Sequence, residues 1–136
     1  MEKENLFQGH LKLTTFCYFK DSNTWNFNFE EKVILQSECL WRFLGNGKIR
    51  YTSNDHGQRY GLERPLDLEK EIKELLHNYA LLRIGRNLMT GDLYFEFDKE
   101  YKFELLTDSI GFENWSLNVN SNLIIGLGQG DVARFE

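Results

Sequence analysis

The chain has 136 residues, of which 16 are Lys or Arg and 21 are Asp or Glu, so its formal net charge is −5. This acidic balance argues against a protein that binds nucleic acid or an anionic membrane, because such proteins use a surplus of Lys and Arg against phosphates. With 41% hydrophobic and 27% charged residues, the composition is that of one ordinary globular domain and excludes intrinsic disorder.

The first ten residues are set apart from the rest. Residues 4–9 resemble an expression-tag protease site that lacks one aromatic residue, so the N-terminal segment 1–10 could derive in part from a tag. The remaining residues, 11–136, form the predicted single α+β domain. Since residues 1–5 are rich in charge and no apolar run reaches the roughly 20 residues that cross a bilayer, we expect a cytoplasmic protein without a membrane partner.

Alternating apolar and polar residues predict a first group of strands. Phe, Tyr and Trp make up 15% of the chain, which favours a sheet. Trp25, Phe27 and Phe29 alternate with asparagines and are expected to share one buried face. In chain order, the predicted strands of this first meander are residues 13–19, 25–29, 33–36, 40–44 and 49–52.

One helix is predicted, over residues 68–77. It follows Pro65, and Asp67 is a candidate N-cap. Its apolar residues fall at i, i+4, i+7 and i+8, which makes a single stripe that a sheet can cover. These residues are Leu68, Ile72, Leu75 and Leu76.

A second group of strands follows the helix. They are predicted at residues 80–84, 93–97, 101–105, 115–119 and 123–127, and a short tail ends the chain. The predicted fold class is therefore α+β: a mostly antiparallel bent sheet of two meanders with one principal amphipathic helix.

Asp55 and His56 are the first candidates for chemistry. A carboxylate next to a histidine can fix the imidazole tautomer for general base catalysis. However, adjacent side chains usually point apart, and no nucleophile motif accompanies this pair or the nearby Gln58. Hydrogen bonding within a turn is the favoured interpretation, and a small hydrolase that uses His56 with Asp55 or Glu113 is the alternative.

Glu113 and Trp115 form the second candidate group. Counting with a period of two places Glu113 on the same side as Trp115, so its carboxylate is predicted to point toward the core. A buried carboxylate must be paired or hydrogen-bonded. We favour bonds to loop amides or to an Arg over a cleft shared with His56 or Asp108.

The glycines, histidines and cysteines predict neither a cofactor nor a metal. Gly126-x-Gly128-x-Gly130 resembles a phosphate-binding loop, but only residues 131–136 follow it, too few for the helix of that motif. A bulge or a tight return is expected there instead. His10, His56 and His77 lack metal-ligand spacing, and Cys17 and Cys39 are predicted to be buried free thiols.

Five short motifs in a fixed order carry a resemblance that spans the chain from about residue 40 onward. They are Trp41-Arg42; Ser53-Asn54-Asp55-His56-Gly57-Gln58 with Gly61-Leu62, Pro65 and Asp67; Gly91-Asp92-Leu93; Phe112-Glu113-Asn114-Trp115; and Gly128-x-Gly130-Asp131. This succession resembles small bacterial domains of polymorphic toxin systems, in particular the immunity proteins of contact-dependent growth inhibition. The resemblance implies that the chain neutralises a cognate toxin delivered by a neighbouring cell, and it supplies no catalytic residues.

An acidic inhibitor would be complementary to a basic toxin such as a nuclease, whose cleft must bind phosphates. Our leading hypothesis is therefore a non-enzymatic immunity protein with a basic toxin domain as its partner. The hydrolase remains the first alternative and a binding module without a toxin the second, and the oligomeric state is left open. The candidate partner-binding residues are Glu30, Glu31, Asp67, Glu69, Glu71, Glu74, Asp98 and Glu100.

Overall fold

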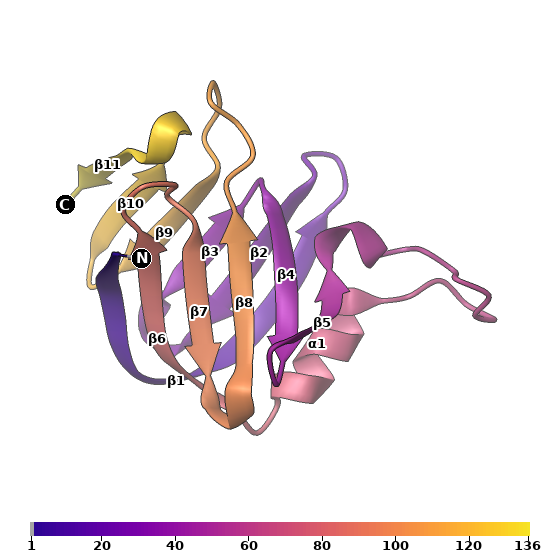
Figure 1. Ribbon diagram of the computed structural model, residues 1–136. Helices are drawn as coiled ribbons and strands as arrows, with labels where there is room; N and C mark the ends of the chain where they lie inside the picture. Colours follow the sequence, from indigo (N-terminus) through magenta and orange to yellow (C-terminus); the bar gives the residue numbers. More distant parts are fainter. Residues whose placement is uncertain (1) are drawn as a thin grey trace.

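The computed structural model describes residues 2–136 and consists mainly of antiparallel strands (Figure 1). Hydrogen bonding joins the strands in the order β11-β10-β9-β3-β2-β1-β6-β7-β8-β4-β5. The elements are β1 (Lys3–Phe19), β2 (Thr24–Phe29), β3 (Ile34–Ser37), β4 (Leu40–Gly45), β5 (Lys48–Thr52), α1 (Leu68–Leu76), β6 (Ala80–Asn87), β7 (Leu93–Phe97), β8 (Tyr101–Leu106), β9 (Trp115–Val119), β10 (Asn122–Gly126) and β11 (Val132–Phe135).

The long strand β1 bends the sheet into two layers. Its first part pairs with β6, from Lys3 to Lys12, and its last part pairs with β2, from Leu13 to Phe19. We call the layer of β1, β6, β7, β8, β4 and β5 sheet A, and the layer of β1, β2, β3, β9, β10 and β11 sheet B. Sheet A lies in front of sheet B in Figure 1, so the fold is a β-sandwich.

The core is packed between the two sheets. Trp25, Phe27 and Phe29 all point inward from β2 and are at most 3% exposed, as their alternation with asparagines predicts. Phe27 packs edge to face on Phe103 of sheet A with 4.9 Å between the ring centres. Aromatic contacts of this kind hold the two layers together.

Helix α1 forms as its sequence predicts. The Asp67 carboxylate accepts a hydrogen bond from the backbone N–H of Lys70 at 3.3 Å, which satisfies one of the unpaired donors of the first turn. Leu68, Ile72 and Leu76 are buried, so the predicted apolar stripe faces the sandwich.

The predicted α+β class is wrong, because the structure is dominated by its antiparallel sheet. Helix α1, the one α-helix within residues 2–136, has nine residues and covers only one side of the sandwich, whereas both layers are sheets. The strand content also exceeds the prediction at both ends of the chain: residues 3–12 pair with β6, and residues 132–135 form β11 where a tail was expected. Within residues 2–136, no helix has the length and the apolar character needed to span a bilayer.

Candidate partner-binding surface

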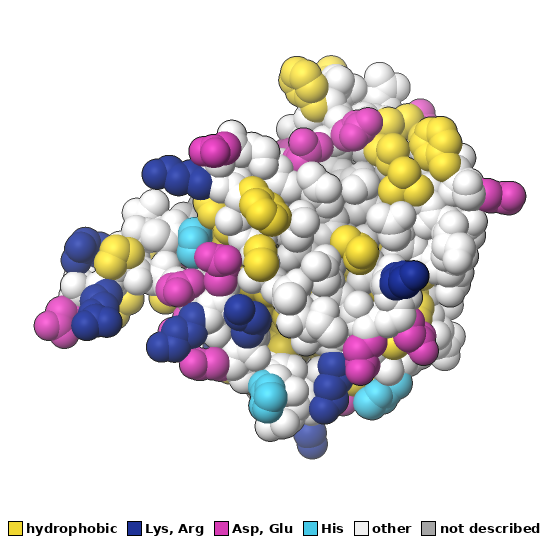
Figure 2. All heavy atoms as spheres, turned by 180° about the vertical axis from the view of Figure 1, so that it is seen from behind, with side chains coloured by type: hydrophobic (Ala, Val, Ile, Leu, Met, Phe, Trp, Pro, Cys, Tyr) yellow, Lys and Arg dark blue, Asp and Glu magenta, His cyan; other side chains and the backbone are white. Residues whose placement is uncertain are grey.

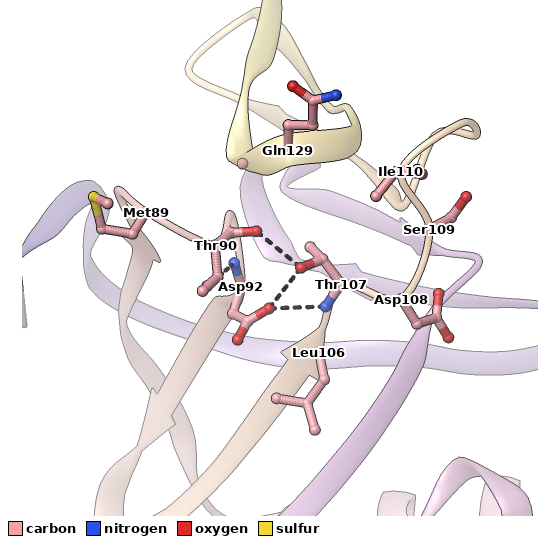
Figure 3. A pocket seen from close by; sticks show the side chains of 10 residues that line it. Met89, Thr90, Asp92, Leu106, Thr107, Asp108, Ser109, Ile110 and Gln129 are labelled. Atoms are coloured by element: carbon pink, nitrogen blue, oxygen red, sulfur yellow. Dashed lines mark hydrogen bonds between the residues drawn. The ribbon is translucent and has the colours of Figure 1, made fainter.

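Three loops meet at the end of the sandwich where β6, β8 and β10 stop (Figure 1). They comprise residues 88–92, 107–114 and 127–131, and we call them the apical loops. Thr107 joins the first two, because its backbone N–H and its hydroxyl both donate to Asp92 Oδ1, at 2.8 and 2.9 Å (Figure 3). Its hydroxyl also lies 2.8 Å from the carbonyl oxygen of Thr90.

Two further bonds connect the first and third loops to the strands below. The indole N–H of Trp115 in β9 donates to the carbonyl oxygen of Gly91 at 3.0 Å. The Arg86 guanidinium in β6 donates to the carbonyl oxygen of Gly130 at 2.8 Å. Both donors are buried, so these bonds satisfy polar groups that could not reach water.

Asn114 organises the middle loop from its inside. Its amide oxygen accepts from the backbone N–H groups of Asp108 and Ser109, at 3.0 and 3.1 Å. Its amide nitrogen donates to the carbonyl oxygens of Ser109 and Leu127, at 3.1 and 3.3 Å. Since Asn114 is 1% exposed, this side chain fixes loop 107–114 against loop 127–131.

The Gly-x-Gly-x-Gly motif allows the apical loops to approach one another closely. A Cβ atom on Gly128 would lie 2.0 Å from the carbonyl oxygen of Ile110, and one on Gly130 would lie 2.2 Å from that of Met89. Gly130 also has a φ of +80°. The motif therefore serves loop packing in this fold.

The apical loops surround a pocket of about 550 Å³ with an apolar rim. Asp92 and Asp108 are among the residues that line it. Met89 is 80% exposed, Ile110 is 82% exposed and Phe112, on the same loop as Ile110, is 81% exposed. Large apolar side chains held at this exposure by a hydrogen-bonded scaffold are typical of a protein-binding surface.

These three apolar residues were not among the sequence-based candidates. Met89, Ile110 and Phe112 lie in turn segments between predicted strands, outside any apolar alternation. Apolar residues in such segments have no sheet face to bury them, and that signal could have identified the surface.

Glu113 does not point toward the core, contrary to the prediction. It is exposed, and its neighbour Asn114 occupies the buried position before Trp115. The period-two count fails because β9 begins only at Trp115, so Glu113 belongs to the loop that Asn114 holds. The buried donors of this loop are bonded by an amide rather than by a carboxylate.

Asp55 and His56 are directed to different partners. The Asp55 carboxylate accepts from the backbone N–H of Thr52 at 2.8 Å and from the Tyr60 hydroxyl at 2.6 Å. Burial alone would raise the pKa of Asp55, but these hydrogen bonds outweigh it and lower the pKa. His56 Nδ1 accepts from the backbone N–H of Leu68 at 3.1 Å, at the start of α1.

The surroundings of His56 are aromatic. Its ring packs edge to face on Tyr18 and Trp25, with 5.3 and 5.1 Å between ring centres. Within residues 2–136, no hydrogen bond joins His56 to Asp55 or to Glu113. Gln58 contributes backbone bonds, donating to the carbonyl oxygen of Asp55 and accepting from Leu66.

The predicted acidic partner-binding residues lie away from the apical loops. The turn at Glu30–Lys32 and the turn at Asp98–Glu100 share one end of the sandwich, because Phe29 and Phe97, which precede them, are in ring contact at 6.0 Å. We call it the basal end, and α1 lies beside it in Figure 1. The candidates at the two turns and on α1 are Glu30, Glu31, Asp67, Glu69, Glu71, Glu74, Asp98 and Glu100.

Four of these acids accept hydrogen bonds from backbone N–H groups. Glu30 accepts from Lys12 and Asp98 from Ala80, and on the helix Asp67 accepts from Lys70 and Glu69 from Tyr18. Each carboxylate thus satisfies a donor that the strands or the helix leave unpaired. The exposed acids Glu31, Glu74 and Glu100 are the ones whose substitution leaves these bonds intact.

Both cysteines are free thiols, but only one is buried. Burial raises the pKa of Cys39 to about 12, so this thiol stays protonated and unreactive at neutral pH. Cys17 is half-buried on the outer side of sheet B. Among residues 2–136, the structure has no group of three or more His, Cys, Asp and Glu side chains placed to hold a metal ion.

Comparisons of the chain with models of protein families, with curated proteins and with solved structures found no match.

Proposed function

We propose that this protein is a non-enzymatic immunity protein that binds a cognate toxin domain in the cytoplasm and neutralises it, with the apical loops as the contact surface. The observation that carries the proposal is the exposure of Met89, Ile110 and Phe112 on the apical loops. Met89 and Ile110 line the pocket together with Asp92 and Asp108. Apolar anchors next to carboxylates favour a partner that presents apolar and basic side chains together.

The construction of the surface supports binding rather than chemistry. Thr107 and Asn114 use their polar groups to hold the loops, so a partner meets a preformed surface and little order has to be created on binding. The hydrolase alternative requires a carboxylate beside His56. The contacts of His56 are instead the Leu68 N–H and two aromatic rings, which favours an immunity protein over a hydrolase.

The proposal is tested by co-expression with the polypeptide encoded immediately upstream. We expect the chain to co-purify with that polypeptide and to rescue growth when the polypeptide is toxic. Ile110→Asp should abolish rescue, because it places a charge in the apolar rim. Ile49→Asp is the matched control, since Ile49 is 54% exposed on β5, away from the apical loops, and this variant should still rescue.

Two results would contradict the proposal. The first is an upstream polypeptide that is toxic but is neither bound nor neutralised. The second is full rescue by a folded Ile110→Asp variant, which would remove the apical loops from the interface. Circular dichroism spectra of both variants establish that they are folded.

A further inference from the structure

The outer faces of the two sheets differ sharply in charge. On sheet A, Lys3 and Arg83 form ion pairs with Glu96, at 3.9 and 3.1 Å. On the same face Arg42 and Lys102 form ion pairs with Glu104. The outer face of sheet A therefore exposes a network of positive and negative side chains to solvent.

Sheet B presents an outer face without charged side chains in its central rows. Strand register aligns the outward-facing residues of all six strands, two from each. One row is Cys17, Asn26, Gln36, Ser116, Ile125 and Ala133, and the other is Thr15, Asn28, Ile34, Asn118, Leu123 and Phe135. We call these two rows the uncharged face. Figure 2 looks onto this side of the molecule and shows a broad field of uncharged groups with the charged side chains around its border.

This lack of charge is unusual for an accessible surface. Charged residues make up 27% of the chain, and Gln36 and Asn118 in the two rows are exposed. Depletion of charged residues, more than excess of apolar ones, distinguishes the centre of a protein interface from other surface. The uncharged face therefore has the composition of an interface.

The asparagines in the middle of the face have unused hydrogen-bonding capacity. The amide oxygens of Asn26 and Asn28 are buried, and neither has a hydrogen-bond partner among residues 2–136. Leaving such an oxygen without a partner costs free energy. A polar surface placed over β2 could bond these amides after a rotation of their side chains.

We propose that the uncharged face is the contact between two copies of this chain, which pack sheet B against sheet B around a two-fold axis. At a two-fold interface the same patch of both copies is in contact, so a charged side chain near the axis would lie opposite the identical charge of the second copy. Two copies that each carry a net charge of −5 repel one another, and this repulsion is smallest where the facing surfaces are uncharged.

The side chains of the uncharged face are also complementary to themselves. Amides and hydroxyls both donate and accept hydrogen bonds, so Asn, Gln, Ser and Thr can pair with the same residue types on a second copy. Carboxylates could not do so. With strands about 4.8 Å apart, six strands span about 24 Å, and the face is only two rows of residues wide, so the contact falls below the size of stable interfaces. A weak, reversible dimer is the expected result.

The pocket residues of the apical loops do not belong to the uncharged face, so the two proposals rest on different residues. The growth-rescue experiment and the dimer experiment therefore test different surfaces. Failure of one leaves the other proposal standing.

Sedimentation equilibrium of the purified chain tests the dimer at about 10 µM to about 1 mM, where an interface of this size associates. We expect the average mass to rise with concentration toward that of two chains. Gln36→Glu places one negative charge per copy in the contact and should raise the dissociation constant at least about tenfold. Asn118→Asp, on the neighbouring strand, is a second variant of the same kind in case the first does not fold.

Gln8→Glu is the matched control. Gln8 is also an exposed strand glutamine, but it pairs with Arg83 on the charged sheet A. Both Glu variants have a net charge of −6, from −5 − 1, so a difference between them reports the location of the charge and not its amount. Gln8→Glu should leave the dissociation constant unchanged.

Salt provides an independent readout. Association of the unmodified chain should be almost insensitive to salt, whereas high salt should partly restore association of Gln36→Glu, because ions screen the new repulsion. A chain that stays monomeric over the whole range would overturn the proposal. Equal effects of Gln36→Glu and Gln8→Glu, or a wild-type dimer that salt dissociates, would overturn it as well.

Discussion

The indole N–H of Trp115 donates to the carbonyl oxygen of Gly91 at 3.0 Å, and this bond connects the two layers of the sandwich. Trp115 begins β9 in sheet B, whereas Gly91 lies in the loop between β6 and β7 of sheet A. Both residues are buried. The bond therefore fixes how apical loop 88–92 sits on the opposite sheet.

A comparison of two tryptophans isolates the contribution of this bond. Trp41 is also fully buried, but its indole N–H has no hydrogen-bond partner among residues 2–136. A Trp→Phe substitution shortens the side chain similarly at both sites, yet only Trp115→Phe leaves the Gly91 carbonyl unpaired. We expect Trp115→Phe to lower the free energy of unfolding by about 1–3 kcal/mol more than Trp41→Phe, measured by urea denaturation. Equal losses would show that the bond adds no stability.

The close approach of the apical loops predicts a steep cost for a single methyl group. In Gly128→Ala the new Cβ would lie 2.0 Å from the Ile110 carbonyl oxygen, so one of the two loops must move. We expect a loss of about 1–3 kcal/mol in the free energy of unfolding, the usual cost of overpacking, measured by thermal denaturation.

Gly111→Ala is the control for this substitution. Gly111 lies in loop 107–114 and does not have a positive φ, and a Cβ added to it would meet no heavy atom within 4 Å. The stability of Gly111→Ala should therefore stay within about 0.5 kcal/mol of wild type. A Gly128→Ala variant as stable as Gly111→Ala would mean that the loops can separate without cost.

The ion pairs of sheet A predict a dependence of stability on pH. Burial alone would raise the pKa of Glu104, but the hydrogen bond from Arg42 and the charges of Lys102 and Arg42 outweigh burial and lower that pKa below its ordinary value. A carboxyl whose pKa is lowered by folding stabilises the folded state above its unfolded pKa. This contribution is lost as the pH falls through the folded pKa.

We therefore expect the stability lost between about pH 5 and about pH 3 to be smaller in Glu104→Gln than in wild type, measured by urea denaturation at each pH. Arg42→Met should reduce the loss too, because it removes the group that lowers the pKa of Glu104. Parallel curves for wild type and Glu104→Gln would show that Glu104 makes no such contribution.

The elements that could be predicted from sequence depend on local rules. The alternation at Trp25, Phe27 and Phe29 follows from the period of a strand, and the cap at Asp67 follows from the unpaired donors of a helix start. Neither depends on the rest of the chain.

The fold class depends on pairing between distant segments. Residues 3–12 join sheet A because they pair with β6, more than 60 residues later, and their own pattern does not indicate that partner. Once both parts of β1 are strands, two sheets enclose the core and α1 is left at one side. The strong local signal of the helix therefore overstates its share of the fold.

The candidate site likewise combines features that follow local rules with features that depend on contacts between distant segments. Counting back from β9 misplaces Glu113, because the alternation stops where Asn114 bonds the loop from within. The exposed residues Met89, Ile110 and Phe112 lie on loops that meet only in the folded chain. A single-sequence pattern can indicate apolar residues in turn segments, but it does not show that these loops meet or that Asn114 is buried.

The acidic residues at the basal end and on α1 allow a test of whether their negative charge attracts a basic partner. This test rests on the proposed function. We consider a variant in which Glu31, Glu74 and Glu100 are all replaced by Lys, which leaves the backbone bonds of the other acids intact. If the basal end steers association, the association rate with the upstream polypeptide should fall at least about tenfold at low salt, measured by stopped-flow fluorescence. The difference should shrink as salt is added.

A second triple variant separates the position of the charge from its amount. Asp21, Glu63 and Glu136 are exposed acids outside the basal turns and α1, and replacing them with Lys changes the net charge equally, from −5 to +1 because −5 + 6 = +1. Similar association rates for the two variants would mean that only the overall charge attracts the partner. If the basal variant associates more slowly than this control, the negative charge that attracts the partner lies at the basal end. Ile110→Asp would then affect mainly the dissociation rate, because it removes apolar contacts that form after the first encounter.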